Sequence, residues 1–176
     1  MTSSREIDLP VLINSRPLSG KQITIIALCS LVALLDGLDT QSIGVAAPLI
    51  AKLFGMERAQ LAPIFSAALV GAAIGALTFG PLADRFGRKP FLVLSALVFG
   101  TFTFLTALCA DFQTLLACRF AAGLGLGGAL PCFVAMSSEF APARLRATVV
   151  TMTWAAFPLG GMLGGFLNAA IIANYG

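Results

Sequence analysis

Two aspartates lie deep inside an apolar segment that begins after Lys21. Asp36 stands 15 residues beyond Lys21 and Asp39 follows three residues later, so Asp36 would lie about 22 Å along a membrane-crossing helix. A charge at that depth costs about 2.5–3.5 kcal/mol on insertion scales, which makes the pair a candidate for proton transfer. Positions i and i+3 share one helix face, and we expect one polar stripe that holds at least one proton. The alternative is a loop there, although the flanking apolar runs are too short to span separately.

Arg119 is a second charged residue inside an apolar run, the one between Asp111 and Glu139. It lies eight residues, about 12 Å, from Asp111, whereas Asp39 lies 13 residues, about 20 Å, from Lys52. We therefore expect Arg119 and Asp39 to meet with modest helix tilt. Protonation of the aspartate would then release the arginine for an anion. The alternative is an arginine that snorkels to the membrane surface.

Several other chemistries are excluded by the residue types. Histidine is absent, so proton transfer falls to carboxylates. Gly123–Gly128 matches G-x-G-x-x-G, but it lies in an apolar helix with no preceding strand, which argues against a dinucleotide site. No HExxH, G-x-S-x-G or dense basic run occurs, so we expect no enzyme, no metal, no cofactor and no nucleic-acid partner. The cysteines show no metal-site spacing and are interpreted as small buried hydrophobes: Cys29, Cys109, Cys118 and Cys132.

The most specific motif is Gly80-Pro81-Leu82-Ala83-Asp84-Arg85-Phe86-Gly87-Arg88-Lys89. We expect a tight turn between two antiparallel helices, since its glycines give the backbone freedom. Within it, Asp84 can cap a helix or pair with Arg88. A bland charged turn would explain the composition of this stretch but not its order.

The composition indicates an integral membrane protein. Of 176 residues, 58% are hydrophobic and 11% charged, whereas an ordinary soluble domain is about a quarter charged. Charged residues divide the chain into five stretches, each long enough to cross a bilayer: 22–51, 59–83, 90–110, 112–138 and 147–176. The predicted fold class is therefore an all-α, polytopic membrane helix bundle, with residues 1–21 as a polar tail and 22–176 as the bundle.

Small residues and loop charges refine this bundle. Glycine pairs four residues apart should allow close helix approach: Gly71/Gly75, Gly123/Gly127, Gly160/Gly164 and Gly161/Gly165. Eight basic residues would share one side of the membrane: Arg5, Arg16, Lys21, Arg85, Arg88, Lys89, Arg144 and Arg146. Only Lys52 and Arg58 would lie on the other side. The positive-inside rule then predicts a cytoplasmic N-terminus in the inner (plasma) membrane.

The string Gly80–Lys89 resembles the loop signature G-x-L-x-D-R-x-G-R-K/R of the major facilitator superfamily, between its second and third helices. Three further stretches resemble later motifs of that superfamily: Arg119 with Gly123, Glu139-x-x-Pro142-x-x-x-Arg146, and more loosely Pro158-x-x-Gly161. The last departs from the pattern, with Phe157 where a glycine precedes the proline. The stretch Asp36–Thr40 resembles the aromatic acid:proton symporters of the superfamily.

The resemblance implies proton-coupled import of aromatic carboxylates. Asp36 and Asp39 would carry the proton, and Arg119 would couple it to the aromatic acid anion. The conformational gate would comprise Gly80, Asp84, Arg85, Gly87, Arg88, Lys89, Glu139 and Arg146. Such carriers have twelve helices in two halves, so we expect this five-helix chain to be a truncated N-terminal part that needs the lipid bilayer and a missing C-terminal half. The alternatives are a sugar or other organic-anion carrier, and a non-transporting membrane fragment.

Overall fold

The computed structural model describes residues 18–55, 57 and 61–175, and the regular structure of this part is helical throughout. Its elements are α2 (Gly20–Phe54), α3 (Ala62–Phe86), α4 (Arg88–Thr106), α5 (Phe112–Phe140), the short 3-10 helix η2 (Ala143–Leu145) and α6 (Arg146–Tyr175). Each of the five α-helices is long and apolar enough to cross a membrane. The predicted all-α bundle of five spans is therefore confirmed. Of the basic residues used to predict orientation, Arg5, Arg16 and Arg58 lie outside the described residues.

Helix α2 runs without interruption from Gly20 to Phe54, so the alternative of a loop at Asp36 and Asp39 is wrong. The Ser19 backbone N–H donates to the Gln22 side chain at 2.8 Å, which satisfies one of the unpaired groups at a helix start. The helix thus begins at Gly20, two residues before the expected start of the bundle. One continuous helix carries both aspartates through the bundle.

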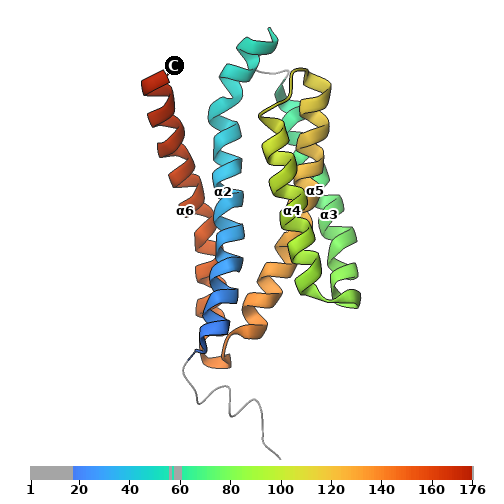
Figure 1. Cartoon of the computed structure of the whole chain (residues 1–176), viewed down its shortest axis with the longest axis vertical. Helices are drawn as coiled ribbons and strands as arrows, with labels where there is room; N and C mark the ends of the chain where they lie inside the picture. Colours follow the sequence, from blue (N-terminus) through green and yellow to red (C-terminus); the bar gives the residue numbers. More distant parts are fainter. Residues whose placement is uncertain (1–17, 56, 58–60, 176) are drawn as a thin grey trace, which may run out of the picture.

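Helix α5 is the centre of the arrangement. It packs along α3 and α4, and it also contacts α2 and α6, whereas α6 packs chiefly against α2. Figure 1 shows α2 and α6 side by side, with the C-terminal part of α5 running toward the foot of α2. Pro131 lies inside α5, where the loss of a backbone donor favours a bend. The bend lets α5 join two groups of helices, α3 with α4 and α2 with α6.

The contact between α3 and α5 is made backbone to backbone. A Cβ added at Gly71 would overlap the carbonyl oxygen of Phe120, and one at Gly123 would overlap that of Ala68. Side chains at these positions would force the helices apart, so the close helix approach expected at these glycines is confirmed, and it joins α3 to α5. This close approach fixes the position of α5 along its axis relative to α3.

The glycines of α6 divide into two kinds. A Cβ at Gly160 would overlap the carbonyl oxygen of Leu34 on α2, as expected for close packing. The expected close approach also holds at Gly161, whose backbone nitrogen would lie 3.0 Å from a Cβ added at Gly37, but Gly161 and Gly165 are themselves less crowded. Their added Cβ atoms would make only ordinary contacts, at 3.7 Å and 3.9 Å from the nearest atoms of α2. Packing against α2 therefore requires glycine at Gly160 but would accept a Cβ at Gly161 or Gly165.

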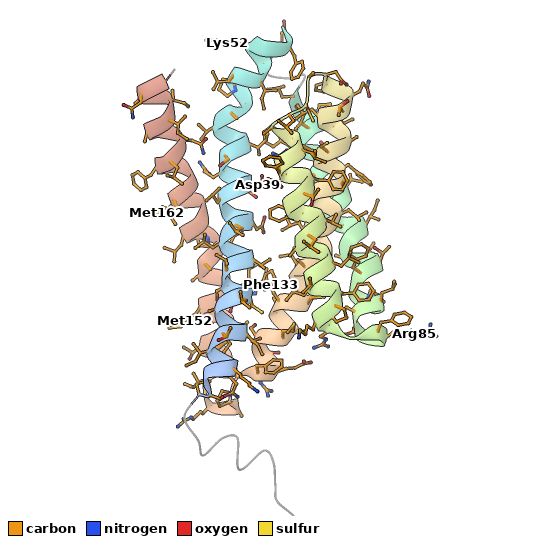
Figure 2. All side chains as sticks on the ribbon, in the orientation of Figure 1. Asp39, Lys52, Arg85, Phe133, Met152 and Met162 are labelled. Carbon is orange, nitrogen blue, oxygen red and sulfur yellow. The ribbon has the colours of Figure 1, made fainter. Side chains whose placement is uncertain are left out.

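A hydrophobic core joins α2, α5 and α6. Cys29 and Ala33 of α2 pack there with Phe133 of α5 and Ala156 of α6, all at least nine-tenths buried. The Phe133 ring meets Trp154 edge to face, with centroids 5.8 Å apart, and Figure 2 shows Phe133 between the two helix groups. Edge-to-face contact is a favoured geometry for aromatic pairs. This core holds the foot of α5 against the α2–α6 pair.

The outer surface is apolar, as a lipid-facing surface must be. Large side chains such as Leu77 and Phe166 are 77% and 68% exposed. Met152 and Met162 point away from the bundle in Figure 2. Charged residues gather at the two ends instead, with Lys52 at one end and Arg85 at the other (Figure 2). The polar residues that remain between the ends are therefore the candidates for function.

Candidate functional site

A buried ion pair joins α2 and α5 between the ends of the bundle. Arg119 Nη1 lies 2.8 Å from Asp39 Oδ2, with the two side chains only 8% and 16% exposed. Figure 2 places Asp39 on the side of α2 that faces the other helix group. The contact agrees with the depths estimated from the sequence, and the guanidinium is held at this pair instead of snorkelling to the helix end. A buried pair of this kind is stable only while each charge keeps its partner.

The Arg119 guanidinium retains an unused donor. Its Nε atom is buried and has no hydrogen-bond partner among the described residues. An unpaired buried donor is costly, especially on a charged group. Arg119 therefore offers a position where an anion could bind through charge-assisted hydrogen bonds.

A hollow of about 310 Å³ opens beside this pair, between α2, α3 and α5. Asp39 and Arg119 form its charged part, and its remaining walls are mainly apolar, with contributions from Ile43, Phe65 and Leu126. Small-molecule sites combine apolar walls with a few polar groups in this manner. The arrangement suits a compact molecule that has an apolar body and one negative charge.

Asp36 has a different environment from Asp39. Asp36 is 5% exposed, and the Thr40 hydroxyl donates to Asp36 Oδ1 at 3.4 Å. The two aspartates therefore have separate partners, so the expected single stripe contains two distinct carboxylate sites. Thr40 was missed by the sequence reasoning, although its position four residues after Asp36 is the spacing of helix neighbours.

A polar contact between α2 and α6 was also missed. The Asn168 amide donates to the Ser42 hydroxyl at 2.9 Å and to the Gly164 carbonyl oxygen at 2.7 Å. Hydrogen bonds between helices contribute to association in membranes, where packing supplies most of the energy. An asparagine in the middle of an apolar stretch was the available signal. This bond helps to hold α6 beside the part of α2 that carries the aspartates.

Three of the predicted gate residues, Asp84, Arg88 and Glu139, form a charged cluster at the end of the bundle marked by Arg85 in Figure 2. Asp84 Oδ1 lies 2.9 Å from Arg88 Nη2, and Arg88 Nη1 also pairs with Glu139 of α5. The predicted turn is shorter than expected, because the stretch from Gly80 through Arg85 is part of α3. The reversal occurs at Gly87, whose φ of 103° favours glycine.

The other predicted gate residues have separate contacts. Arg146 Nε donates to the Ser138 carbonyl oxygen at 3.0 Å, at the junction of α5 and α6. The Arg85 guanidinium lies 5.5 Å from the centroid of the Phe86 ring, within cation–π range. Lys89 borders a hollow of about 870 Å³ between α2 and α4. Arg88 is thus the residue that links the α3–α4 turn to α5.

A sequence model described as Major Facilitator Superfamily matches residues 29–176. The chain belongs to the major facilitator superfamily. The five helices and the Asp84–Arg88 turn are therefore those of a transporter family, and the chain is a multi-pass membrane protein and not an enzyme. The match includes both Asp39 and Arg119.

Relatives within the superfamily are named as aromatic acid transporters. The chain is 45% identical over 172 residues to the 4-hydroxybenzoate transporter of Pseudomonas putida, covering 98% of this chain and 38% of the relative. It is 43% identical over 152 residues to the 3-(3-hydroxy-phenyl)propionate transporter of Escherichia coli strain K12. That alignment covers 86% of this chain and 38% of the relative. It is 38% identical over 170 residues to the gallate transporter of P. putida, in an alignment that covers 97% of this chain and 38% of the relative. The chain thus spans 38% of the length of each of these relatives.

Proposed function

We propose that residues 1–176 form the N-terminal part of a carrier that imports small aromatic carboxylates together with protons. The observation that carries this proposal is the buried Arg119–Asp39 pair beside a hollow with apolar walls. The names of the relatives support the substrate class. The complete carrier, meaning the product of the full reading frame that contains these residues, would have a second half that closes the other side of the hollow.

Exchange of partners at Arg119 would couple the proton to the anion. While Asp39 is ionised, it neutralises Arg119 through the 2.8 Å contact. When Asp39 takes up a proton, the arginine loses its counter-charge, and a substrate carboxylate takes the place of Asp39 at the guanidinium. Because an unpaired charge in the bilayer is costly, the carrier would change conformation only when it holds both a proton and an anion, or when it holds neither. Net transport then requires both to move together.

Asp36 would serve as a second carboxylate on the proton route. It is buried one helical turn from Asp39 and bonded to Thr40, so a proton could pass along one side of α2. The cluster of Asp84, Arg88 and Glu139 would hold α3 and α4 to α5 in one conformation. Breaking the ion pairs of this cluster would permit the alternative conformation. The basic residues gathered at that end support a cytoplasmic location for it, with the N-terminus on the same side of the inner membrane.

The test is accumulation of labelled 4-hydroxybenzoate in proteoliposomes that contain the complete carrier. We expect an inward proton gradient to drive accumulation and a protonophore to abolish it. Asp39→Asn should abolish accumulation yet preserve exchange of internal for external substrate, because the neutral amide resembles a protonated aspartate. Accumulation that survives collapse of the gradient, or that is undiminished in Asp39→Asn, would contradict the proposal. Uptake of sugars in place of aromatic acids would favour a different carrier class.

A further inference from the structure

A second hollow lies between α2 and α6, next to the one that contains the ion pair. Its volume is about 630 Å³, within the range of about 300–1,000 Å³ common for small-molecule sites. Thr40 borders both hollows, so they adjoin across a ridge on α2. Besides Thr40, the second hollow is lined by Gly37, Gln41, Phe157, Gly161 and Phe166, among others.

Helix packing requires glycine at Gly37, which lines this hollow, but not at Gly161 or Gly165. Gly160 and Gly164 lie against α2, where added Cβ atoms would come closer than 3.0 Å to backbone oxygens. Gly161 and Gly165 line the hollow and have room for a Cβ at ordinary contact distance. A larger side chain at either position would project into the hollow. Their effect is to keep this space open.

The polar group of the hollow is the Gln41 amide. Its side chain is exposed and has no hydrogen-bond partner among the residues that the structure describes. An amide on a membrane-spanning helix is unfavourable toward lipid, so this surface of α2 fits a polar ligand better. The amide can both donate to and accept from a hydroxyl group. Phe157 of α6 adds an aromatic face beside it, which suits contact with a second ring.

We propose that this hollow receives the hydroxyl-bearing end of an aromatic acid whose carboxylate is bound at Arg119, and that Gln41 selects acids with a ring hydroxyl. The ring would lie across Thr40, with one end in each hollow. This inference rests on the proposed function and adds the chemical feature that distinguishes one aromatic acid from another. Asp39, Thr40 and Gln41 are consecutive residues, so one segment of α2 would lie beside both the carboxylate end and the hydroxyl end of the substrate.

The first test compares two substrates in the complete carrier. Gln41→Leu should raise KM for 4-hydroxybenzoate about tenfold, because it removes a hydrogen bond to the hydroxyl. KM for benzoate, and kcat for both acids, should stay at the wild-type values. An equal change for both acids, or no change for either, overturns the assignment. If the wild-type carrier takes up neither acid, the proposed function is overturned together with this inference.

A second test fills the hollow without altering its polar group. Gly161→Leu should leave the amount of carrier in the membrane unchanged and raise KM for both acids, since the side chain occupies the space of the ring. Ala155→Leu is the control, because Ala155 is exposed on the same helix and does not line the hollow, and it should transport as the wild type does. Wild-type KM values in Gly161→Leu, with normal aromatic acid uptake, would overturn this inference alone.

Discussion

At the scale of single residues, Arg119 binds Asp39 with one nitrogen while another remains unpaired. A guanidinium can present two parallel donors to a carboxylate, whereas a lysine ammonium is a compact point charge. The geometry thus distinguishes a residue that only balances charge from one that exchanges partners. Substitution by lysine separates these two roles because it preserves the charge.

We predict that Arg119→Lys lowers the initial rate of aromatic acid uptake by the complete carrier about tenfold or more. Loss of one partner from a buried charge pair costs about 2–5 kcal/mol, and lysine restores only part of it. The measurement is uptake per amount of carrier in the membrane, determined by immunoblot. Normal insertion is expected, so a wild-type rate would show that any cation at position 119 suffices.

At the scale of helices, the contact between α3 and α5 depends on glycine. We predict that Gly123→Ala destabilises the bundle by about 1–3 kcal/mol, the usual cost of overpacking, because its methyl group would overlap the Ala68 carbonyl oxygen. Gly100→Ala is the control, with open space at its Cβ and a small gain expected from reduced backbone freedom. The measurement is thermal unfolding in detergent. Equal stability of the two variants would refute close packing at Gly123.

The start of α5 should depend on pH. Asp111 accepts hydrogen bonds from the Thr114 backbone N–H at 2.8 Å and from the Thr114 hydroxyl at 2.6 Å. These bonds lower the pKa of Asp111 below its ordinary value. Its contribution to stability is therefore complete above the unfolded-state pKa, about 3.9, and is lost as pH falls through the lower folded-state value.

We predict that Asp111→Ala lowers the melting temperature at pH 7 and has less effect at the lowest accessible pH. The reason is that protonation removes the same helix cap in the wild type. Gln113→Ala, on the exposed surface of the same turn, is the control. A difference between Asp111→Ala and wild type that is constant across pH would contradict the capping role.

At the scale of the whole molecule, the chain spans 38% of the length of its relatives. We predict that residues 1–176 expressed alone catalyse no uptake and are recovered as oligomers or aggregates. Polar residues that would face a second half, such as Thr40 and Gln41, would otherwise face lipid. Co-expression with the remaining part of the carrier should restore uptake and monodisperse behaviour in size-exclusion chromatography. Proton-coupled uptake by the isolated monomer would refute this prediction.

The fold was predictable because the bilayer imposes a simple constraint. Each span must be long and apolar, so charges alone located the five helices. The meeting of Arg119 with Asp39 followed from depth, which depends only on the rise of a helix. Rotation about the helix axis was not predictable, since it is fixed by neighbours. This is why the open space beside Gly161 and Gly165 was not expected and why the position of Thr40 between two hollows was missed.

The extent of the α3–α4 turn was misjudged for a related reason. The glycines and charges of Gly80–Lys89 indicate a turn somewhere in that stretch, but one residue with a positive φ, Gly87, is sufficient to reverse the chain. The remaining residues extend α3 and place Asp84 four residues before Arg88. The charged cluster is therefore built on helix ends, which hold it more rigidly than a loop would.

The pairing of helices has a consequence for biosynthesis. Helix α2 packs chiefly on α6, and α3 packs chiefly on α5, so each early helix acquires its main partner late. Domains and segments emerge from the ribosome N-terminus first, and α2 therefore enters the membrane before Arg119 has been translated. During that interval the Asp39 carboxylate has no cation to neutralise it. The nascent chain must then either retain a proton on Asp39 or keep α2 within the insertion machinery until α5 arrives.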